Sequence, residues 1–159
     1  QTKKVDFYIS NKDASCSSIF DLSQEVKNGE LWNEHKVKMI NKIKLNMIKF
    51  DDAIDKYKIE LFKYNHWIID LQGSEIQFLK GAKESLSLCK SILIEISQKK
   101  FYAEGSTSWK ELKFFLNQNG FINKSEPSSD HCDILFTRVE NEKKSFNLWY
   151  IWARWLLSS

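Results

Sequence analysis

The strongest constraint on the fold is a strand–helix–strand pattern in residues 67–97. Residues 67–70 (WIID) are a short apolar run that ends in an aspartate, and residues 91–97 (SILIEIS) are a second apolar run. Between them, residues 74–89 carry apolar side chains at the three- and four-residue spacing of an amphipathic helix. Strands joined in this way normally lie parallel, with a right-handed crossover. The pattern therefore predicts an α/β fold.

Further elements are predicted on both sides of this unit. Predicted strands cover residues 5–10, 37–50, 121–125 and 132–139, and predicted helices cover residues 51–60 and 106–120. The first two strands should pair antiparallel as an N-terminal β-hairpin, because the second alternates polar and apolar residues along much of its length. The last two strands should form another antiparallel pair.

Helix ends are marked by capping residues. Ser74 is predicted to cap the helix that follows it, and Glu75 suits the positive end of the same helix dipole. Ser108 and Glu111 have the spacing of a capping box, and Gly120 should close that helix.

Length and composition indicate one globular domain. A chain of 159 residues with 42% apolar residues can bury a sizeable core. The formal net charge is +3, but the positive charge is nearly all lysine, with Arg138 and Arg154 the only arginines. Because nucleic-acid recognition usually relies on the forked guanidinium group, we expect no nucleic-acid partner.

The cysteines predict neither a disulfide framework nor a metal site. Cys16, Cys89 and Cys132 are widely spaced and odd in number. They are interpreted as reduced thiols, two of them buried, of a cytoplasmic protein. Residues 130–133 (DHCD) include metal-ligand types, but neighbours on a strand point to opposite faces, so no joint metal site is expected.

In this order of elements, the chain resembles the C-terminal part of the FkbM-family S-adenosylmethionine-dependent methyltransferases. IIDLQGSEIQFLKGA (68–82) is similar to the family's strand-four signature, and ILIEIS (92–97) to its strand five. SWKELKFFLNQNGF (108–121) is similar to the helix that leads into the next strand. Upstream, VDFYISNKDASCSSIFDL (5–22) and IKFDDAIDKY (48–57) resemble the segments that precede strand four.

The resemblance implies a partial Rossmann-like class I methyltransferase fold. Strands four to seven and their flanking helices would occupy residues 51–140, behind a hairpin segment at residues 1–50. The family grips its cofactor with a glycine-rich turn after strand one and an acidic residue after strand two, and this sequence contains neither. The first three strands are therefore expected upstream of Gln1, and the isolated chain is expected to be inactive. Strand four would then have an exposed apolar edge that should pair with something.

Asp70 and Glu95 are the predicted catalytic residues. Ligands of open α/β sheets bind beyond the carboxyl ends of the strands, so the resemblance places Asp70 at the substrate. Glu95 is embedded in an apolar strand, where a carboxylate is costly without a task or a partner. The alternatives are that Asp70 only shapes a turn and that Glu95 only pairs with a nearby lysine.

Four residues are predicted to contact the substrate. Gln72 and Gly73 would shape the turn after Asp70, and Tyr102 and Glu104 lie in the loop after strand five, where the resemblance places substrate loops. The alternative is that the second pair belongs to a plain connecting loop. His66 is interpreted as a surface histidine.

The tail, residues 141–159, is predicted to form a helix rich in tryptophan. Trp149, Trp152, Trp155 and Leu156 are at helical spacing, but the apolar stretch is too short to span a bilayer. Packing on its own domain, docking on a partner or a second copy, and peripheral membrane contact remain open.

Two functions are compatible with these observations. The first is a methyltransferase that uses S-adenosylmethionine, with O-methylation of a sugar or another small hydroxyl-bearing molecule as the expected reaction. The second is a non-catalytic binding or assembly module that uses an exposed sheet edge and the tail. A small-molecule or glycan acceptor is the expected partner of the first, and a homo-oligomer would suit the second.

Overall fold

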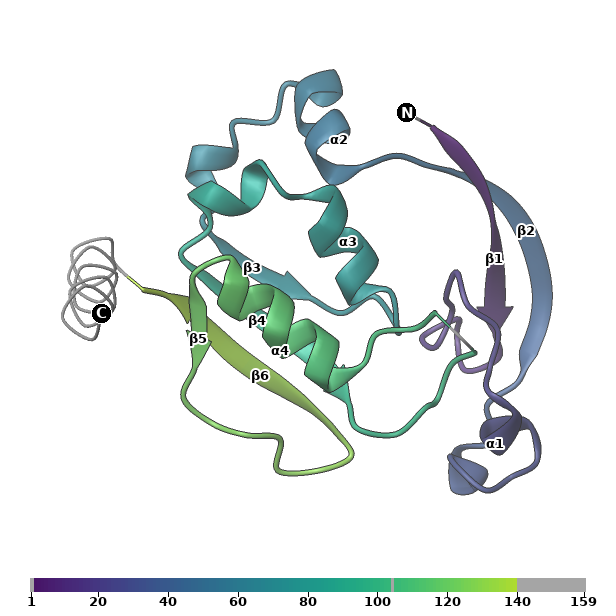
Figure 1. Cartoon of the computed structure of the whole chain (residues 1–159). Coiled ribbons are helices and arrows are strands. Elements are labelled where there is room, and N and C mark those ends of the chain that lie inside the picture. Colours follow the sequence, from purple (N-terminus) through teal and green to yellow (C-terminus); the bar gives the residue numbers. More distant parts are fainter. Residues whose placement is uncertain (1, 104, 140–159) are drawn as a thin grey trace, which may run out of the picture.

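The structure, a computed structural model, describes residues 2–103 and 105–139. Its main sheet has four strands in the order β3–β4–β6–β5 (Figure 1). These strands are β3 (His66–Ile69), β4 (Ser91–Ser97), β5 (Phe121–Asn123) and β6 (His131–Arg138). β3 and β4 are parallel, as predicted, whereas β6 is antiparallel to both β4 and β5. The predicted α/β class and the predicted antiparallel pair are therefore confirmed.

Helices cover one side of this sheet (Figure 1). They are α2 (Phe50–Tyr57), α3 (Glu75–Gly81) and α4 (Trp109–Gln118), with short 3₁₀ turns η2 (Leu61–Lys63) and η3 (Ser85–Leu88). The helix predicted over residues 74–89 is too long, because α3 ends at Gly81 and η3 follows as a separate turn. The reason is a contact with α2, in which the Asp51 carboxylate accepts hydrogen bonds from the backbone N–H groups of Glu84 and Ser85 (3.0 and 2.9 Å).

Two of the three predicted helix-end signals are confirmed. The Ser108 hydroxyl accepts a hydrogen bond from the Glu111 backbone N–H (3.3 Å) at the start of α4. Gly120 follows the end of α4 with a φ of +83°, a conformation that favours glycine. The prediction for Ser74 is wrong, because its hydroxyl donates to the Leu71 carbonyl group instead of accepting from the helix.

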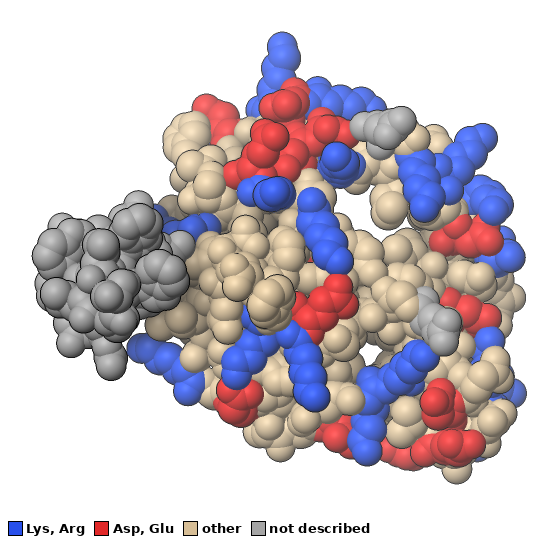
Figure 2. All heavy atoms as spheres, in the orientation of Figure 1, with Lys and Arg blue, Asp and Glu red and all other residues tan. Residues whose placement is uncertain are grey.

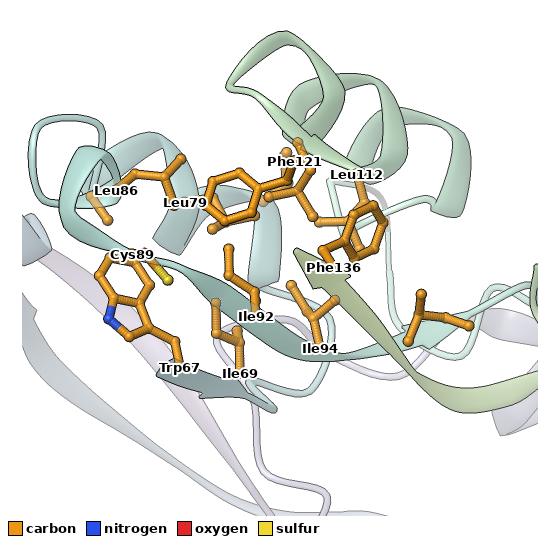
Figure 3. Close-up of a cluster of buried hydrophobic side chains, with 14 of the residues drawn as sticks. Trp67, Ile69, Leu79, Leu86, Cys89, Ile92, Ile94, Leu112, Phe121 and Phe136 are labelled. Carbon is orange, nitrogen blue, oxygen red and sulfur yellow. The ribbon is translucent and has the colours of Figure 1, made fainter. Parts of the chain in front are cut away.

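The main core lies between the sheet and its helices. Alternate residues of β4, including Ile92 and Ile94, point toward the helices, where Leu79 of α3 and Leu112 of α4 meet them (Figure 3). Phe136 of β6 completes this layer and is fully buried. The period of two in the strands and the helical period in α3 and α4 thus produce one apolar layer.

The opposite face of the sheet is exposed in the described part of the chain. Ile68 of β3, Leu93 of β4 and Leu135 of β6 form a row of directly paired residues across three strands. Ile68 is 81% exposed and Leu135 is 50% exposed. Around Ile68 and Leu135, the open face of the main sheet is therefore largely uncovered by described residues.

A two-stranded sheet lies beside the main sheet (Figure 1). It pairs β1 (Lys3–Ser10) antiparallel with β2 (Met39–Met47), which confirms the predicted hairpin. The chain between these strands contains α1 (Gln24–Lys27) and a 3₁₀ turn, η1 (Asn33–His35). Leu22, Val26 and Val37 from this part pack on Phe101 and Tyr102, which follow β4. This packing places the connecting segment at the carboxyl end of β4.

The cysteines are free thiols, but the prediction that two of them are buried is wrong. Only Cys89 is buried, whereas Cys16 and Cys132 are half-exposed. Cys16 lies at the margin of the packing around Leu22, and Cys132 lies at the margin of the main core.

The predicted tail helix at residues 141–159 lies outside the described residues, as does Glu104. Within the described residues, no helix combines the length and the apolar character that a bilayer span requires.

Candidate functional site

The carboxyl ends of β3 and β4 bring the two predicted catalytic residues together. Asp70 directly follows β3 and is exposed, and Glu95 lies on the open face of the adjacent strand. The side-chain amide of Gln72 joins them, because its Nε2 donates to Asp70 Oδ1 (2.6 Å) and to Glu95 Oε2 (3.1 Å). Since parallel strands end at one edge of a sheet, residues far apart in the chain meet here. We call Asp70 and Glu95 the acid pair.

The turn after Asp70 needs the two residues that the sequence singled out. Gln72 has a φ of +51° and Gly73 a φ of +94°, and this second value favours glycine. A Cβ atom on Gly73 would lie 2.9 Å from a ring carbon of Tyr102. Gly73 is thus fixed by both backbone conformation and close packing.

Glu75 stabilises the same turn in a way that its position in the sequence did not reveal. It is buried, and its Oε1 accepts hydrogen bonds from the backbone N–H groups of Leu71 (3.1 Å) and Gly73 (3.0 Å). The side chain therefore points back to the turn, where it satisfies two donors of the loop. The sequence predicted only that Glu75 interacts with the dipole of α3. Its hydrogen bonds to the turn are an additional role.

Tyr102 fixes the orientation of Gln72 from the other side. Its hydroxyl lies 2.6 Å from Gln72 Oε1 and 3.2 Å from the carbonyl oxygen of Cys16. Because the hydroxyl donates to Oε1, the amide presents its N–H groups to the acid pair. Tyr102 is only 5% exposed, so it packs against the turn instead of facing solvent, and the alternative of a plain connecting loop stays open. Its predicted contact with a substrate stays a prediction.

His131 is a member of the site that sequence reasoning missed. Its Nε2 lies 2.9 Å from Glu95 Oε1, and its Nδ1 lies 3.0 Å from Ser97 Oγ. In the sequence, His131 belongs to DHCD (130–133), for which no joint metal site is expected. Among the described residues, no three His, Cys, Asp or Glu side chains lie close enough together to hold a metal ion. His131 reaches Glu95 because β6 pairs with β4. The local sequence around His131 does not indicate this pairing.

Burial and neighbouring acids keep a proton on Glu95. Its side chain is 14% exposed, and burial together with Asp70, Glu75 and Asp133 raises the pKa of Glu95 to about 8. The predicted alternative of a lysine partner is wrong for the described residues, since Gln72 and His131 are the side chains that contact the Glu95 carboxyl group. At neutral pH the Glu95 carboxyl group therefore holds a proton.

Two hollows adjoin these residues. A cavity of about 20 Å³, room for one water molecule, is lined by Glu95, Glu75 and Tyr102. A groove of about 880 Å³ lies between β2 and the segment that contains α1 and η1. Trp32 lines this groove, and its ring centroid lies 6.0 Å from that of Tyr102 and 6.2 Å from that of His131. Trp32 thus lines the groove and also packs against Tyr102 and His131, two residues that contact the Gln72–Glu95 cluster.

Comparison with protein-family models gives a match over residues 1–122 to a model described as Methyltransferase FkbM domain. The matched part includes the hairpin, the Gln72 turn and Glu95, and it ends within β5. No curated protein and no solved structure gives a significant match.

Proposed function

Because the chain belongs to the FkbM methyltransferase family, we propose that the acid pair serves the acceptor side of a methyl-transfer site. Members of this family generally depend on S-adenosylmethionine. The observation that carries the proposal is the placement of Asp70 at the carboxyl end of β3, next to a protonated Glu95. We interpret the main sheet as strands four to seven of a partial Rossmann-like methyltransferase fold.

The two hollows next to the acid pair do not fit the cofactor itself. The space next to Glu95 holds about one water molecule, and the ring of Tyr102 fills the approach to Gly73. In the larger groove, Gly29 is the one glycine of the lining. The Asp21 carboxylate there is already bound by Lys27 Nζ and by the Leu22 backbone N–H, both at 2.7 Å. A glycine-rich turn with a free carboxylate for ribose hydroxyls is therefore not formed by these groups.

Asp70 is the group we assign to proton transfer. Its carboxylate is exposed at the sheet edge, where an acceptor molecule can reach it. With S-adenosylmethionine supplying the methyl group, Asp70 would accept the proton that the acceptor hydroxyl gives up when its oxygen takes that methyl group. Glu95 remains protonated near neutral pH and supplies a neutral neighbour, while Gln72 holds both carboxyl groups in place.

The groove supports a sugar or another small hydroxyl-bearing acceptor. Tyr8 and Trp32 supply flat aromatic surfaces, and Asn28 and Asn33 supply amide groups in the same lining. Its volume is within the range of small-molecule sites, and a few polar groups on an apolar wall can orient a ring with several hydroxyls. O-methylation is the reaction we propose for such an acceptor. Figure 2 shows basic and acidic side chains interspersed on the viewed face, which favours a small acceptor over a polyanion.

Family membership favours the enzyme over the alternative of a non-catalytic binding or assembly module. A homo-oligomer formed through the sheet edge or the tail, peripheral membrane contact and a cytoplasmic location stay predictions.

The assigned role of Asp70 is tested by Asp70→Asn in a polypeptide that contains these residues and binds S-adenosylmethionine. We expect kcat for methyl transfer to fall by about 100-fold or more, because a positioned general base contributes on that order. Asp55→Asn on α2 is the matched control and should leave kcat unchanged, since Asp55 is exposed and belongs to neither the acid pair nor the Gln72 turn. Unchanged turnover in Asp70→Asn would remove the assigned role.

A second measurement addresses the cofactor. Calorimetric titration of the isolated 159-residue chain with S-adenosylmethionine should give no measurable heat of binding, because the described hollows do not fit it. Micromolar affinity would contradict this and would place the cofactor site among the residues of this chain.

A further inference from the structure

A serine, a histidine and a glutamate form a continuous chain of contacts on the open face of the main sheet. Ser97 of β4 and His131 of β6 are direct cross-strand partners, and Ser97 Oγ lies 3.0 Å from His131 Nδ1. Two residues before Ser97, Glu95 points to the same face, and its Oε1 lies 2.9 Å from His131 Nε2. Both ring nitrogens of the histidine are therefore engaged.

We propose that His131 is a positioning residue that holds the Glu95 carboxyl group beside Asp70, and that Ser97 selects the ring tautomer this requires. This inference adds detail to the proposed function. The role of His131 in methyl transfer rests on that function. The contacts that carry it do not depend on methyl transfer.

The proposed tautomer is the one in which the Ser97 hydroxyl donates to His131 Nδ1 across the 3.0 Å contact. A hydroxyl can donate to Nδ1 of a neutral imidazole, which leaves the ring proton on Nε2. That N–H group points at Glu95 Oε1, while Gln72 Nε2 donates to Glu95 Oε2. Each carboxyl oxygen then has its own donor, so the Glu95 side chain is held from two directions.

Aromatic rings restrict the histidine. The rings of Trp32 and Phe101 lie nearly perpendicular to the His131 ring, with centroids 6.2 and 5.9 Å away. Trp32 and Phe101 are themselves stacked at 4.2 Å. One side of His131 is exposed. The two aromatic rings on its other side restrict rotation of the imidazole, as is required of a residue that orients a partner.

The charged and titratable groups around Glu95 come from every neighbouring element. Asp70 after β3, Glu75 on α3 and Asp133 on β6 each disfavour the ionised form of Glu95. Tyr102 packs from the loop after β4 and carries no charge near neutral pH, since burial raises its pKa above its usual range. Lys99 lines the same small cavity, but its ammonium group pairs with Asp130 (3.7 Å).

His131 opposes these effects. An N–H group donated to a carboxylate favours its ionised form and lowers its pKa. Removing the imidazole should therefore raise the pKa of Glu95 further, because the acids remain and a donor is lost.

A second histidine–serine pair on the same sheet provides a matched control. His66 of β3 and Ser91 of β4 are also cross-strand partners, with His66 Nδ1 2.6 Å from Ser91 Oγ. They lie at the opposite end of the strands from Glu95. Among the described residues, no acidic ion-pair partner of His66 is found.

The test is a pH titration of the Glu95 side-chain carboxyl carbon by nuclear magnetic resonance in the full chain. We expect His131→Phe to raise the titration midpoint by about one pH unit. His66→Phe should leave the midpoint unchanged. An unchanged or lowered midpoint in His131→Phe would overturn the proposal, and so would an equal rise in both variants. A purely structural role of His131 would lower stability without this selective shift.

A milder variant keeps the proposal testable if His131→Phe does not fold. Ser97→Ala retains the imidazole and removes one oxygen, so the ring should redistribute its proton between Nδ1 and Nε2, visible in the ¹⁵N shifts of His131. An unchanged tautomer in Ser97→Ala would contradict the role of Ser97. These measurements do not involve methyl transfer, so a negative result for Asp70→Asn would refute the proposed function and leave them standing.

Discussion

At the scale of single residues, Glu95 shows how the fold sets the chemistry of one group. Its carboxyl group is surrounded by other acids, yet Gln72 Nε2 donates to one of its oxygens and His131 Nε2 contacts the other. Burial disfavours its charge, and Asp70 adds repulsion at close range. The fold thereby makes Glu95 the protonated member of the acid pair.

This protonation makes stability depend on pH. The pKa of Glu95 is about 8 in the folded chain and near its usual value of 4.5 when unfolded. Between these values the folded state binds one more proton, so its contribution to stability falls as pH rises from about 4.5 to about 8. Below and above this window the contribution is constant.

Glu95→Gln removes this dependence. We expect the free energy of unfolding of the variant, relative to the parent chain, to increase between pH 5 and pH 8. The difference should change by up to about 1.4 kcal/mol per pH unit before solvent screening is considered. Urea titrations at four pH values measure it, and carboxyl groups that do not interact with Glu95 cancel in the comparison. A difference that stays constant or decreases across this range would mean that Glu95 is ionised in the folded chain.

At the scale of elements, β3 separates a core face from an open face within two residues. Ile69 points to the helices and is buried, whereas Ile68 points away and pairs with Leu93 on the open face. The two side chains are identical, so any difference between them comes from the sheet and not from residue type.

Truncating the two isoleucines should therefore have unequal effects. Ile69→Ala should lower the free energy of unfolding by about 2–5 kcal/mol, because it leaves a cavity in the core. Ile68→Ala should change it by less than about 0.5 kcal/mol, as is usual for an exposed side chain. Chemical denaturation of both variants measures the contrast. Similar losses would show that the open face of β3 is covered in solution.

Another element-scale feature is the junction around Arg138 at the end of β6. Its guanidinium group donates to the carbonyl groups of Cys89 (2.7 Å), Asn119 (3.2 Å) and Leu86. It also lies over the ring of Phe121 at 4.3 Å. One of the two arginines of the chain thus joins η3, the end of α4 and two strands, a structural use that fits the multiple donors of the group.

At the scale of the whole molecule, the site depends on how the hairpin segment meets the main sheet. The Ser18 hydroxyl donates to the Gln72 carbonyl group (2.7 Å), and the Tyr102 hydroxyl links Gln72 to Cys16. Leu22 and Tyr102 form an additional β-bridge. The turn next to the acid pair is therefore held by residues from both parts.

Removing one hydroxyl should loosen this connection. Tyr102→Phe leaves Gln72 Oε1 without its donor, which should cost about 1 kcal/mol and increase amide hydrogen exchange in residues 11–37. Tyr57→Phe, on the exposed side of α2, is the matched control and should leave exchange unchanged. Exchange in residues 11–37 that is identical in Tyr102→Phe and the parent chain would show that apolar packing alone holds the segment.

The sequence by itself determined the order of the elements and half of the site. The strand at residues 67–70, the helix after it and the strand at residues 91–97 follow from periodicities that need no distant contact. The same local reading placed Asp70 at a strand end and marked Glu95 as a charge in an apolar run. The family resemblance rested on these stretches, and the match over residues 1–122 confirms it.

Only the tertiary structure decided what these residues touch. His131 meets Glu95 because β6 inserts beside β4 in a register that pairs Ser97 with His131. The helix α3 ends at Gly81 because Asp51 of α2 supplies acceptors for the next turn. Both contacts join residues more than thirty positions apart, and their geometry depends on strand order and helix packing. Local periodicity predicts neither strand order nor helix packing. It indicates which face a residue occupies, but not which element lies opposite that face.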